Sequence, residues 1–433
     1  MQHSAQVTRR WPITKPVSLL LLLAGMAQAL SLAWPFEGTF KGDAQGWLQC
    51  VSLAVLAFHI DRSQSGKEAF VKAWVFALAW LAGSIWWLFI SMHRYGGLAA
   101  PVAGLAVGLM AGGLALFYAA AAAVYHAICK TGVGVLPRAG AFAAVWVLAE
   151  MVRGTLWTGF PWGAVGYAHV DSLLQHWAPW MGVYGLCALS AFMAMAVAAE
   201  RKDNRPTTRA TQLVVAAIVA VLGYTWFMSP SQSVDEEALS KKPLSVTLLQ
   251  GNIPQDLKFG EGVSLALRDY REALLSSTSD LTVTPETAIP LIQQQMPERY
   301  WSQLETHFSK GKQAALIGLP LAQRSEQGQL QYSNSAIALM PQATPASTAS
   351  YQYDKHHLVP FGEFVPPLFQ WFVRMMNIPL GDFNRGDVAQ PSFVFKGERI
   401  APNICYEDLF GEELARSFAD PDKAPTLMVN LSN

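Results

Sequence analysis

The sequence predicts two parts of different fold class: a polytopic α-helical membrane bundle and, after it, an extracytoplasmic α/β domain. Hydrophobic residues make up 52% of the 433-residue chain and charged residues only 14%, whereas an ordinary soluble domain carries roughly 25% charged residues. The apolar residues are concentrated in long runs before about residue 230, and the remainder has the composition of a globular domain. The formal net charge of zero gives no indication of a nucleic-acid partner.

Seven apolar runs are long enough, at about 20 residues each, to cross a bilayer as helices. They cover roughly residues 16–35, 44–60, 70–92, 99–128, 138–152, 176–199 and 211–229. The run at 138–152 is the shortest and carries Glu150 near its end. Seven such runs disfavour the alternative of buried helices in a large soluble protein. We therefore interpret residues 1–229 as a transmembrane bundle of about seven helices.

Basic residues in the short loops predict the orientation, because cytoplasmic loops are enriched in Lys and Arg. With a cytoplasmic N-terminus, twelve lie on the inner side: Arg9, Arg10, Lys15, Arg62, Lys67, Lys72, Lys130, Arg138, Arg201, Lys202, Arg205 and Arg209. Only Lys41, Arg94 and Arg153 lie on the outer side. An odd number of crossings then places residues 230–433 on the periplasmic side of a bacterial inner membrane. The first run also resembles a signal peptide, but we expect it to stay as an uncleaved anchor because further spans follow directly.

After a linker at 230–243, residues 244–433 alternate between strand-like and helix-like segments. The predicted strands cover 244–250, 280–284, 314–321, 334–340, 350–353, 400–405 and 426–431, and the predicted helices cover 264–277, 298–310 and 408–419. Such alternation with added hairpins predicts a layered α/β sandwich. The last strand is apolar throughout and nothing after it would cover it, so we expect this domain to lack its C-terminal part.

Three strand ends carry residues suited to nucleophilic catalysis. Glu286, Lys355 and Cys405 each come at or just after the end of a predicted strand. At Cys405 a helix N-terminus and a nearby cation are expected to lower the thiol pKa. Together they can supply a carboxylate that takes the thiol proton, a sulfur that holds an acyl group and a cation that stabilises an oxyanion.

Each of these residues also has an ordinary structural interpretation, as a surface turn, a solvated lysine or a buried thiol. Cys50, Cys129 and Cys187 lie within or at the ends of apolar runs, where cysteine acts as a small hydrophobe. Cys405 is the only cysteine of the outer domain and has no disulfide partner there. The combination of three residues, rather than any one of them, indicates thiol chemistry.

In order and spacing, this Glu–Lys–Cys set resembles the triad of the nitrilase superfamily, and the preceding bundle narrows the resemblance to the apolipoprotein N-acyltransferase family. The motifs that carry it are Glu150…Arg153-Gly154, Thr158-Gly159-Phe160-Pro161-Trp162, Gln250-Gly251-Asn252-Ile253-Pro254-Gln255, Pro285-Glu286, Lys355 to Pro366 (KHHLVPFGEFVP) and Ile404-Cys405-Tyr406-Glu407. The resemblance covers essentially the whole chain and implies a nitrilase-like αββα sandwich. Two departures are Phe259, where members often have Trp, and the end of the chain after the strand at 426–431, where members continue.

The resemblance implies a two-step acyl transfer without metal or cofactor. Glu286 would act as base while Cys405 takes a fatty acyl chain from a membrane phospholipid as a thioester. The α-amino group of an apolipoprotein's diacylglyceryl-cysteine would then accept it, and Lys355 would stabilise the oxyanion. Four further residues would support the site: Tyr406 through its backbone N–H, Glu363, Glu407 and Asn334. The protein is expected to be a monomer.

Alternatives to this function are a membrane-tethered amidase with the same triad, an inactive fragment, and a transporter or sensor with a binding domain. A transporter would need charged residues inside the spans, where Glu150 is nearly alone. The apolar segment 368–376 fits either a core helix or an arm that dips into the lipid interface. His356-His357 is not expected to bind metal, because no further ligand cluster accompanies it.

Overall fold

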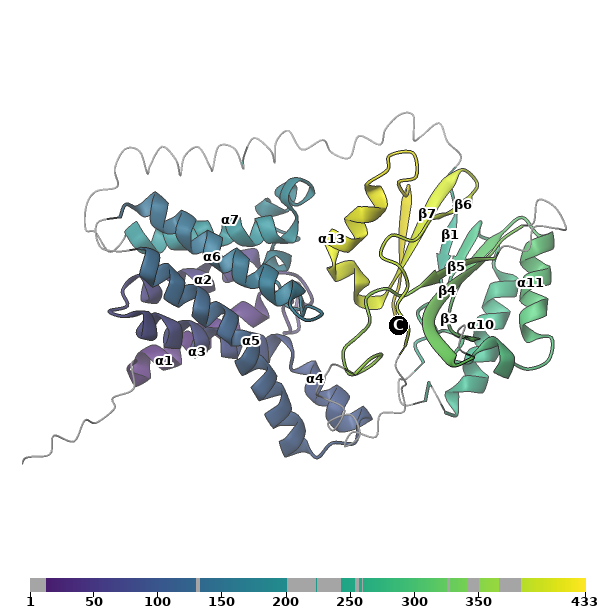
Figure 1. The fold of residues 1–433 in the computed structure, drawn as a ribbon, viewed down its shortest axis with the longest axis horizontal. Coiled ribbons are helices and arrows are strands. Elements are labelled where there is room, and N and C mark those ends of the chain that lie inside the picture. Colours follow the sequence, from purple (N-terminus) through teal and green to yellow (C-terminus); the bar gives the residue numbers. More distant parts are fainter. Residues whose placement is uncertain are drawn as a thin grey trace, which may run out of the picture. The chain divides into compact units, whose positions relative to one another are not determined.

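The computed structural model describes residues 13–129, 133–200, 223, 243–253, 257–258, 260–324, 328–341, 350–365 and 383–433. The predicted span at 211–229, apart from Gly223, and the apolar segment 368–376 lie outside these residues. The chain divides into two compact units, one of residues up to Ser233 and one of Val234–Asn433, with Tyr95–Gly97 grouped with the second. The described helical bundle belongs to the first unit and the described sheets to the second (Figure 1).

Six of the predicted apolar runs form helices in the first unit. These are α1 (Lys15–Leu30), α2 (Gly46–Asp61), α3 (Gly66–Ser84), α5 (Ala100–Ile128), α6 (Val135–Thr155) and α7 (Ala178–Glu200), and α4 (Trp87–Ile90) with a π-helical turn at Ser91–Tyr95 follows α3. By length and composition, three helices in the described part of the chain could span a membrane, or four if the bent pair after Gly66 forms one span. Helices α1 and α2 are apolar but shorter.

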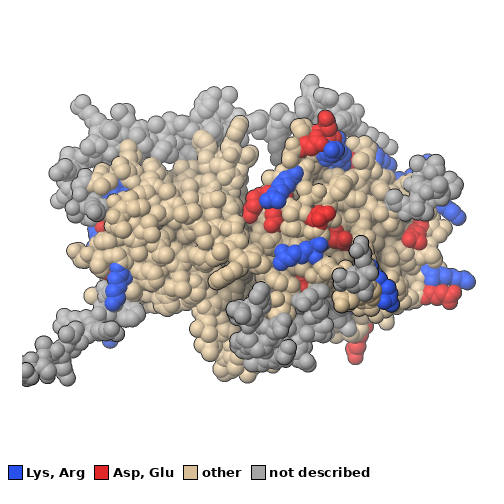
Figure 2. Space-filling view, viewed as in Figure 1, with Lys and Arg blue, Asp and Glu red and all other residues tan. Residues whose placement is uncertain are grey.

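Small residues and aromatic rings hold this bundle together. A Cβ at Gly25 of α1 would overlap the Phe76 carbonyl oxygen of α3, so these helices approach closely, as small residues allow in membrane proteins. The buried rings of Trp80, Tyr118 and Trp146 cluster, with centroids 4.9 Å apart for the first pair and 4.8 Å for the second. The face of the bundle visible in Figure 2 is almost free of charged side chains, as contact with lipid requires.

A fully buried ion pair fixes the motif between Glu150 and Trp162. Arg153 and Glu150 lie 2.7 Å apart with neither side chain exposed. Arg153 also binds the Tyr118 hydroxyl at 2.8 Å and donates to the backbone carbonyls of Phe160 and Trp162. The arginine therefore ties the segment after α6 to the interior of the bundle.

A second buried pair joins α2 to α6. Arg138 lies 3.1 Å from Asp61, whose carboxylate also accepts a hydrogen bond of 2.8 Å from the Tyr125 hydroxyl. The sequence interpretation assigns Arg138 and Arg153 to loops and notes only Glu150 as a charge inside the spans, whereas both arginines belong to α6 and are buried. Both sets of charges are paired with protein groups, which is how a membrane bundle tolerates them.

The second unit contains two β-sheets. The larger has the order β1 (Val246–Leu248), β2 (Leu281–Val283), β3 (Ala314–Arg324), β4 (Leu330–Leu339) and β5 (Tyr351–Asp354), parallel from β1 to β3 and antiparallel from β3 to β5. The smaller has the order β6 (Phe393–Phe395), β7 (Glu398–Ile404) and β8 (Leu427–Leu431), with β6 antiparallel and β8 parallel to β7.

Alternation along the strands builds a layered sandwich. Leu316 of β3 packs with Ile404 of β7 in a core between the two sheets. The neighbouring residue Ile317 points the other way and packs under α10 (Gly262–Ser276) and α11 (Tyr300–Lys310). Figure 1 shows these two helices on one side of the paired sheets and α13 (Gly411–Leu414) on the other. The predicted nitrilase-like αββα architecture is confirmed.

Several predicted bounds differ from the structure. The strand predicted at 244–250 covers only Val246–Leu248. Strand β6 was not predicted, because three residues are too few to show the alternating pattern of a strand. The helix predicted at 408–419 is wrong as a single element. It is a 3-10 turn over Cys405–Leu409, one α turn and another 3-10 turn, in a stretch interrupted by the non-helical Phe410.

Candidate active site

The loop after β2 places Glu286 against the neighbouring strand β3. The Thr284 backbone N–H donates to the Leu316 carbonyl at 2.9 Å, and the Gly318 N–H donates to the Thr284 hydroxyl at 2.9 Å. Only glycine fits at position 318, because a Cβ there would overlap the Pro285 carbonyl and lie 3.0 Å from the Glu286 Cα. The carboxylate is thus held by two strands rather than by a surface turn.

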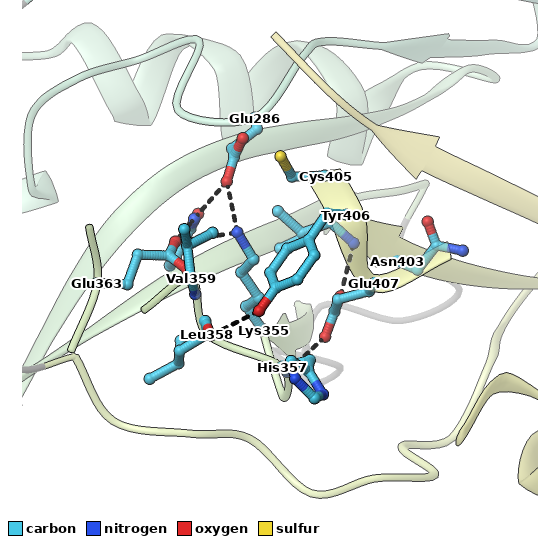
Figure 3. Close-up of polar contacts among 12 residues, drawn as sticks. Glu286, Lys355, His357, Leu358, Val359, Glu363, Asn403, Cys405, Tyr406 and Glu407 are labelled. Atoms are coloured by element: carbon cyan, nitrogen blue, oxygen red, sulfur yellow. Dashed lines mark hydrogen bonds and ion pairs between the residues drawn. The ribbon is translucent and has the colours of Figure 1, made fainter. Parts of the chain in front are cut away.

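Lys355 follows β5 directly and its ammonium group lies at the centre of the site. Its backbone N–H donates to the Asn334 carbonyl at 2.8 Å, and its side chain is fully buried. The Nζ atom lies 2.9 Å from Glu286 Oε1 and 3.0 Å from Glu363 Oε1 (Figure 3). Burial by itself lowers the pKa of Lys355, but the two carboxylates outweigh it and raise that pKa above its ordinary value. The ammonium is charged throughout the neutral range.

Asn334 joins the two carboxylates from the side. Its Nδ2 donates to Glu286 Oε1 at 2.7 Å and to Glu363 Oε1 at 2.6 Å. Burial raises the pKa of Glu286, but Lys355 and Asn334 more than offset this and lower the pKa of that carboxyl below its usual range. Because both donors use Oε1, we assign Oε2 as the oxygen that can accept a proton.

Cys405 lies at the end of β7 with a left-handed backbone, φ 58°. The Asn430 Nδ2 of β8 donates to its carbonyl oxygen at 2.7 Å, which secures the turn. Figure 3 shows the sulfur beside the Glu286 carboxylate. The structure thus brings Glu286, Lys355 and Cys405 together at three strand ends.

The predicted lowering of the Cys405 thiol pKa is wrong. Burial, followed by the negative charge of Glu286, raises the pKa of Cys405 to about 12, and Lys355 offsets only part of this. The turn that follows is a five-residue 3-10 segment, too short for a substantial helix dipole. The resting residue is therefore a protonated thiol that lies beside a carboxylate.

Glu407 connects the Cys405 turn to the segment after Lys355. Its carboxylate accepts backbone N–H bonds from Ile404 at 2.6 Å, His356 at 2.7 Å and His357 at 3.0 Å. Burial raises the pKa of Glu407, which these three N–H groups oppose. The carboxylate therefore links the ends of β5 and β7.

Two other predicted supporting residues lie in the same network. The Tyr406 hydroxyl donates to the Leu358 carbonyl at 2.8 Å, and Glu363 Oε2 accepts the Val359 N–H at 2.8 Å. The His357 ring stacks on the ring of Phe410, which follows the Cys405–Leu409 turn, with centroids 3.4 Å apart. These contacts fix the KHHLVPFGE segment around the triad.

The sequence reasoning missed Lys258. This lysine is 7% exposed, and its Nζ donates to the Glu286 carbonyl oxygen at 3.2 Å. Burial lowers the pKa of Lys258 below its ordinary value, with a contribution from the charge of Lys355, and the charges of Glu286 and Cys405 offset only part of this. Lys258 follows the Gln250–Gln255 motif by three residues, but a lone lysine in a polar turn carries no sequence signal for burial.

Known families match both units. Residues 24–196 match the apolipoprotein N-acyltransferase N-terminal domain, and residues 245–424 match the carbon-nitrogen hydrolase family. The apolipoprotein N-acyltransferase of Verminephrobacter eiseniae is 49% identical over 95% of this chain and 76% of that protein. The chain belongs to the apolipoprotein N-acyltransferase family.

A second relative supports this placement. The apolipoprotein N-acyltransferase of Ralstonia nicotianae is 40% identical over 96% of this chain and 77% of its own length. A crystal structure of a carbon-nitrogen hydrolase from Helicobacter pylori aligns at 16% identity with a TM-score of 0.28, covering 44% of this chain and 59% of that one, too low to support any argument. The family membership predicted from the motifs is confirmed, and with it the class of enzyme, an acyltransferase of a membrane protein family.

Proposed function

We propose that this protein transfers a fatty acyl chain from a membrane phospholipid, through a thioester on Cys405, to the N-terminal amino group of the diacylglyceryl-cysteine of apolipoproteins. The observation that supports it best is the grouping of a buried ammonium, an ionised carboxylate and a thiol at three strand ends. The names of the relatives agree with lipoprotein N-acylation.

In the first step the Cys405 sulfur attacks the ester carbonyl carbon of the donor while Oε2 of Glu286 takes the thiol proton. The oxyanion that forms is stabilised by the Lys355 ammonium and the backbone N–H of Tyr406. The ester C–O bond then breaks, and the leaving lysophospholipid oxygen takes the proton back from Glu286. The products are an acyl thioester and an alcohol.

In the second step the acceptor amine attacks the thioester carbon. Glu286 takes a proton from the amine, the C–S bond breaks, and the proton returns to the departing sulfur, which restores the thiol and leaves an amide. Since the carboxylate ends each step as it began, no metal or cofactor is needed to balance the reaction. Because the thiol pKa is high, the sulfur is protonated at the start and at the end of the cycle, and the proton leaves it only during attack.

The topology and organisation of the chain follow as part of the proposal. Residues 1–229 form the membrane bundle, 230–243 a linker and 244–433 the catalytic domain, on the periplasmic side of the inner membrane. The distribution of Lys and Arg in the loops supports this orientation, and we propose a monomer. Reporter fusions after Asn433 that are active only in the periplasm would agree with it, and fusions active only in the cytoplasm would contradict it.

The thioester is the decisive test. The full chain, purified from membranes and incubated with phosphatidylethanolamine without acceptor, should gain the mass of one acyl chain on the Cys405 peptide. Neutral hydroxylamine should remove that mass, and Cys405→Ser should not gain a hydroxylamine-labile adduct. Absence of the adduct from the wild-type chain under these conditions would overturn the proposed mechanism.

A further inference from the structure

A second lysine lies buried beside the triad with few partners. Lys258 sits in a turn in which the Gly260 and Gly262 N–H groups donate to the Leu257 carbonyl at 3.0 and 2.9 Å. Gly262 is required there, because a Cβ would lie 2.7 Å from that carbonyl oxygen. The turn positions the Lys258 backbone, and the 3.2 Å hydrogen bond to the Glu286 carbonyl positions its ammonium group.

The partner set of this ammonium is unusual for a buried lysine. An ammonium has three donors, and in the described part of the chain the structure records one hydrogen bond for it, to a backbone carbonyl. Buried lysines are normally paired with a carboxylate. Neither ion pair recorded near the site involves Lys258, since both carboxylates are held by Lys355.

Lys258 balances the formal charge of the site. Lys355 is shared between Glu286 and Glu363, so these three groups together carry one excess negative charge. Lys258 brings the formal sum of the four groups to zero. Its electrostatic neighbours are Glu286, Cys405 and Lys355, so its charge acts on the sulfur as well as on the base.

We infer that Lys258 is a positioning residue of the acyl transfer: it holds the main chain of Glu286 and supplies the second positive charge against which the Cys405 thiol loses its proton. It acts through Glu286 and Cys405 and does not need to touch the substrate. Its role in acylation rests on the proposed function, whereas its effect on the thiol is a property of the site itself.

The test uses three variants of the full chain in detergent. Lys258→Met removes the charge at similar length, Lys258→Arg keeps it, and Lys423→Met removes an exposed lysine of the same domain as the matched control. Without phospholipid, the rate of Cys405 alkylation by iodoacetamide is followed by peptide mass mapping from pH 7 to 10. Mapping is needed because Cys50, Cys129 and Cys187 are also free.

Removal of a nearby cation raises the pKa of a thiol, and one pKa unit corresponds to a tenfold lower thiolate fraction. Lys258→Met should therefore be alkylated more slowly across this range, by up to about tenfold, while Lys258→Arg and Lys423→Met stay near the wild-type rate. A residue that only supports packing would give the opposite result, because a loosened site exposes the sulfur. Alkylation of Lys258→Met at or above the wild-type rate would refute the inference.

Acylation by phosphatidylethanolamine is the second measurement. Lys258→Met should slow thioester formation with little change in the half-saturating phospholipid concentration, and Lys258→Arg should restore most of the rate. If Lys258→Met does not accumulate, Lys258→Gln takes its place in both measurements. A wild-type chain that forms no thioester would refute the proposed function, while the alkylation rates would still decide the role of Lys258.

Discussion

Replacement of Glu286 with glutamine should slow the acylation of Cys405 and, at the same time, make its thiol more acidic. Glutamine has nearly the shape of glutamate and can still accept the hydrogen bonds that Lys355 and Asn334 make at 2.9 and 2.7 Å. What it lacks is the negative charge and the ability to take a proton. The variant should therefore acylate poorly and yet carry a more acidic thiol.

The magnitudes follow from the site. Loss of a general base typically lowers the rate about 10²–10⁴-fold, so thioester formation should fall by that amount. With a thiol pKa of about 12, the wild-type thiolate fraction at pH 7.5 is on the order of 10⁻⁴ to 10⁻⁵, against roughly a tenth for a free cysteine. Each unit by which the pKa falls on removal of the carboxylate raises that fraction about tenfold.

The two rates can be measured on one preparation. Acylation is followed by intact mass after addition of phosphatidylethanolamine, and alkylation by iodoacetamide is followed at pH 7.5 on the Cys405 peptide without phospholipid. Glu272→Gln, a charge loss on the exposed face of α10, is the matched control and should change neither rate. Alkylation of Glu286→Gln no faster than wild type would show that the carboxylate does not set the thiol pKa. Acylation at the wild-type rate would exclude Glu286 as the base.

Three further changes test the supports of the site and the bundle. Lys355→Met should abolish acylation and destabilise the domain by about 3–5 kcal/mol near neutral pH, because Glu286 and Glu363 are left uncompensated. The folded-state pKa of Glu286, which Lys355 lowers in the wild type, then rises, so the loss of stability should shrink as the pH falls toward 5. Denaturation curves that show the same loss near neutral pH and at pH 5 would contradict this. Gly318→Ala should lower thioester formation at least about tenfold by displacing Glu286, whereas Gly411→Ala, in open space, should not; equal rates would show that the close approach is unimportant. Arg153→Met should make the segment after α6 sensitive to protease, and unchanged digestion would exclude the arginine as its anchor.

Much of the candidate site could be read from the chain because its residues belong to local patterns. Glu286 and Cys405 follow apolar strands, and Lys355 follows a strand in which tyrosines alternate with polar residues; both patterns are visible without any partner strand. The bundle was visible for the same reason, since lipid requires long apolar helices whose backbones are satisfied internally. Whether the three groups perform the proposed roles is left to the experiments above.

Other features could not be predicted because they depend on distant parts of the chain. Lys258 reaches Glu286 across 28 residues, and Asn334, which only the family resemblance had suggested, reaches it across 48. No local pattern distinguishes these polar side chains from solvated ones. The predicted helix at 408–419 is interrupted at Phe410, whose ring stacks on that of the distant His357.

The sequence by itself determined the class of each part, the strand ends that bear the triad and the family, because composition, periodicity and motifs are properties of neighbouring residues. Only the tertiary structure decided the ionisation of the site. The pKa of Cys405 depends on how deeply the sulfur is buried and on the distances to one carboxylate and one ammonium from other strands. Burial and through-space charge outweigh the effect expected of a helix N-terminus, so the thiol that the sequence predicted to be acidic is held protonated beside Glu286.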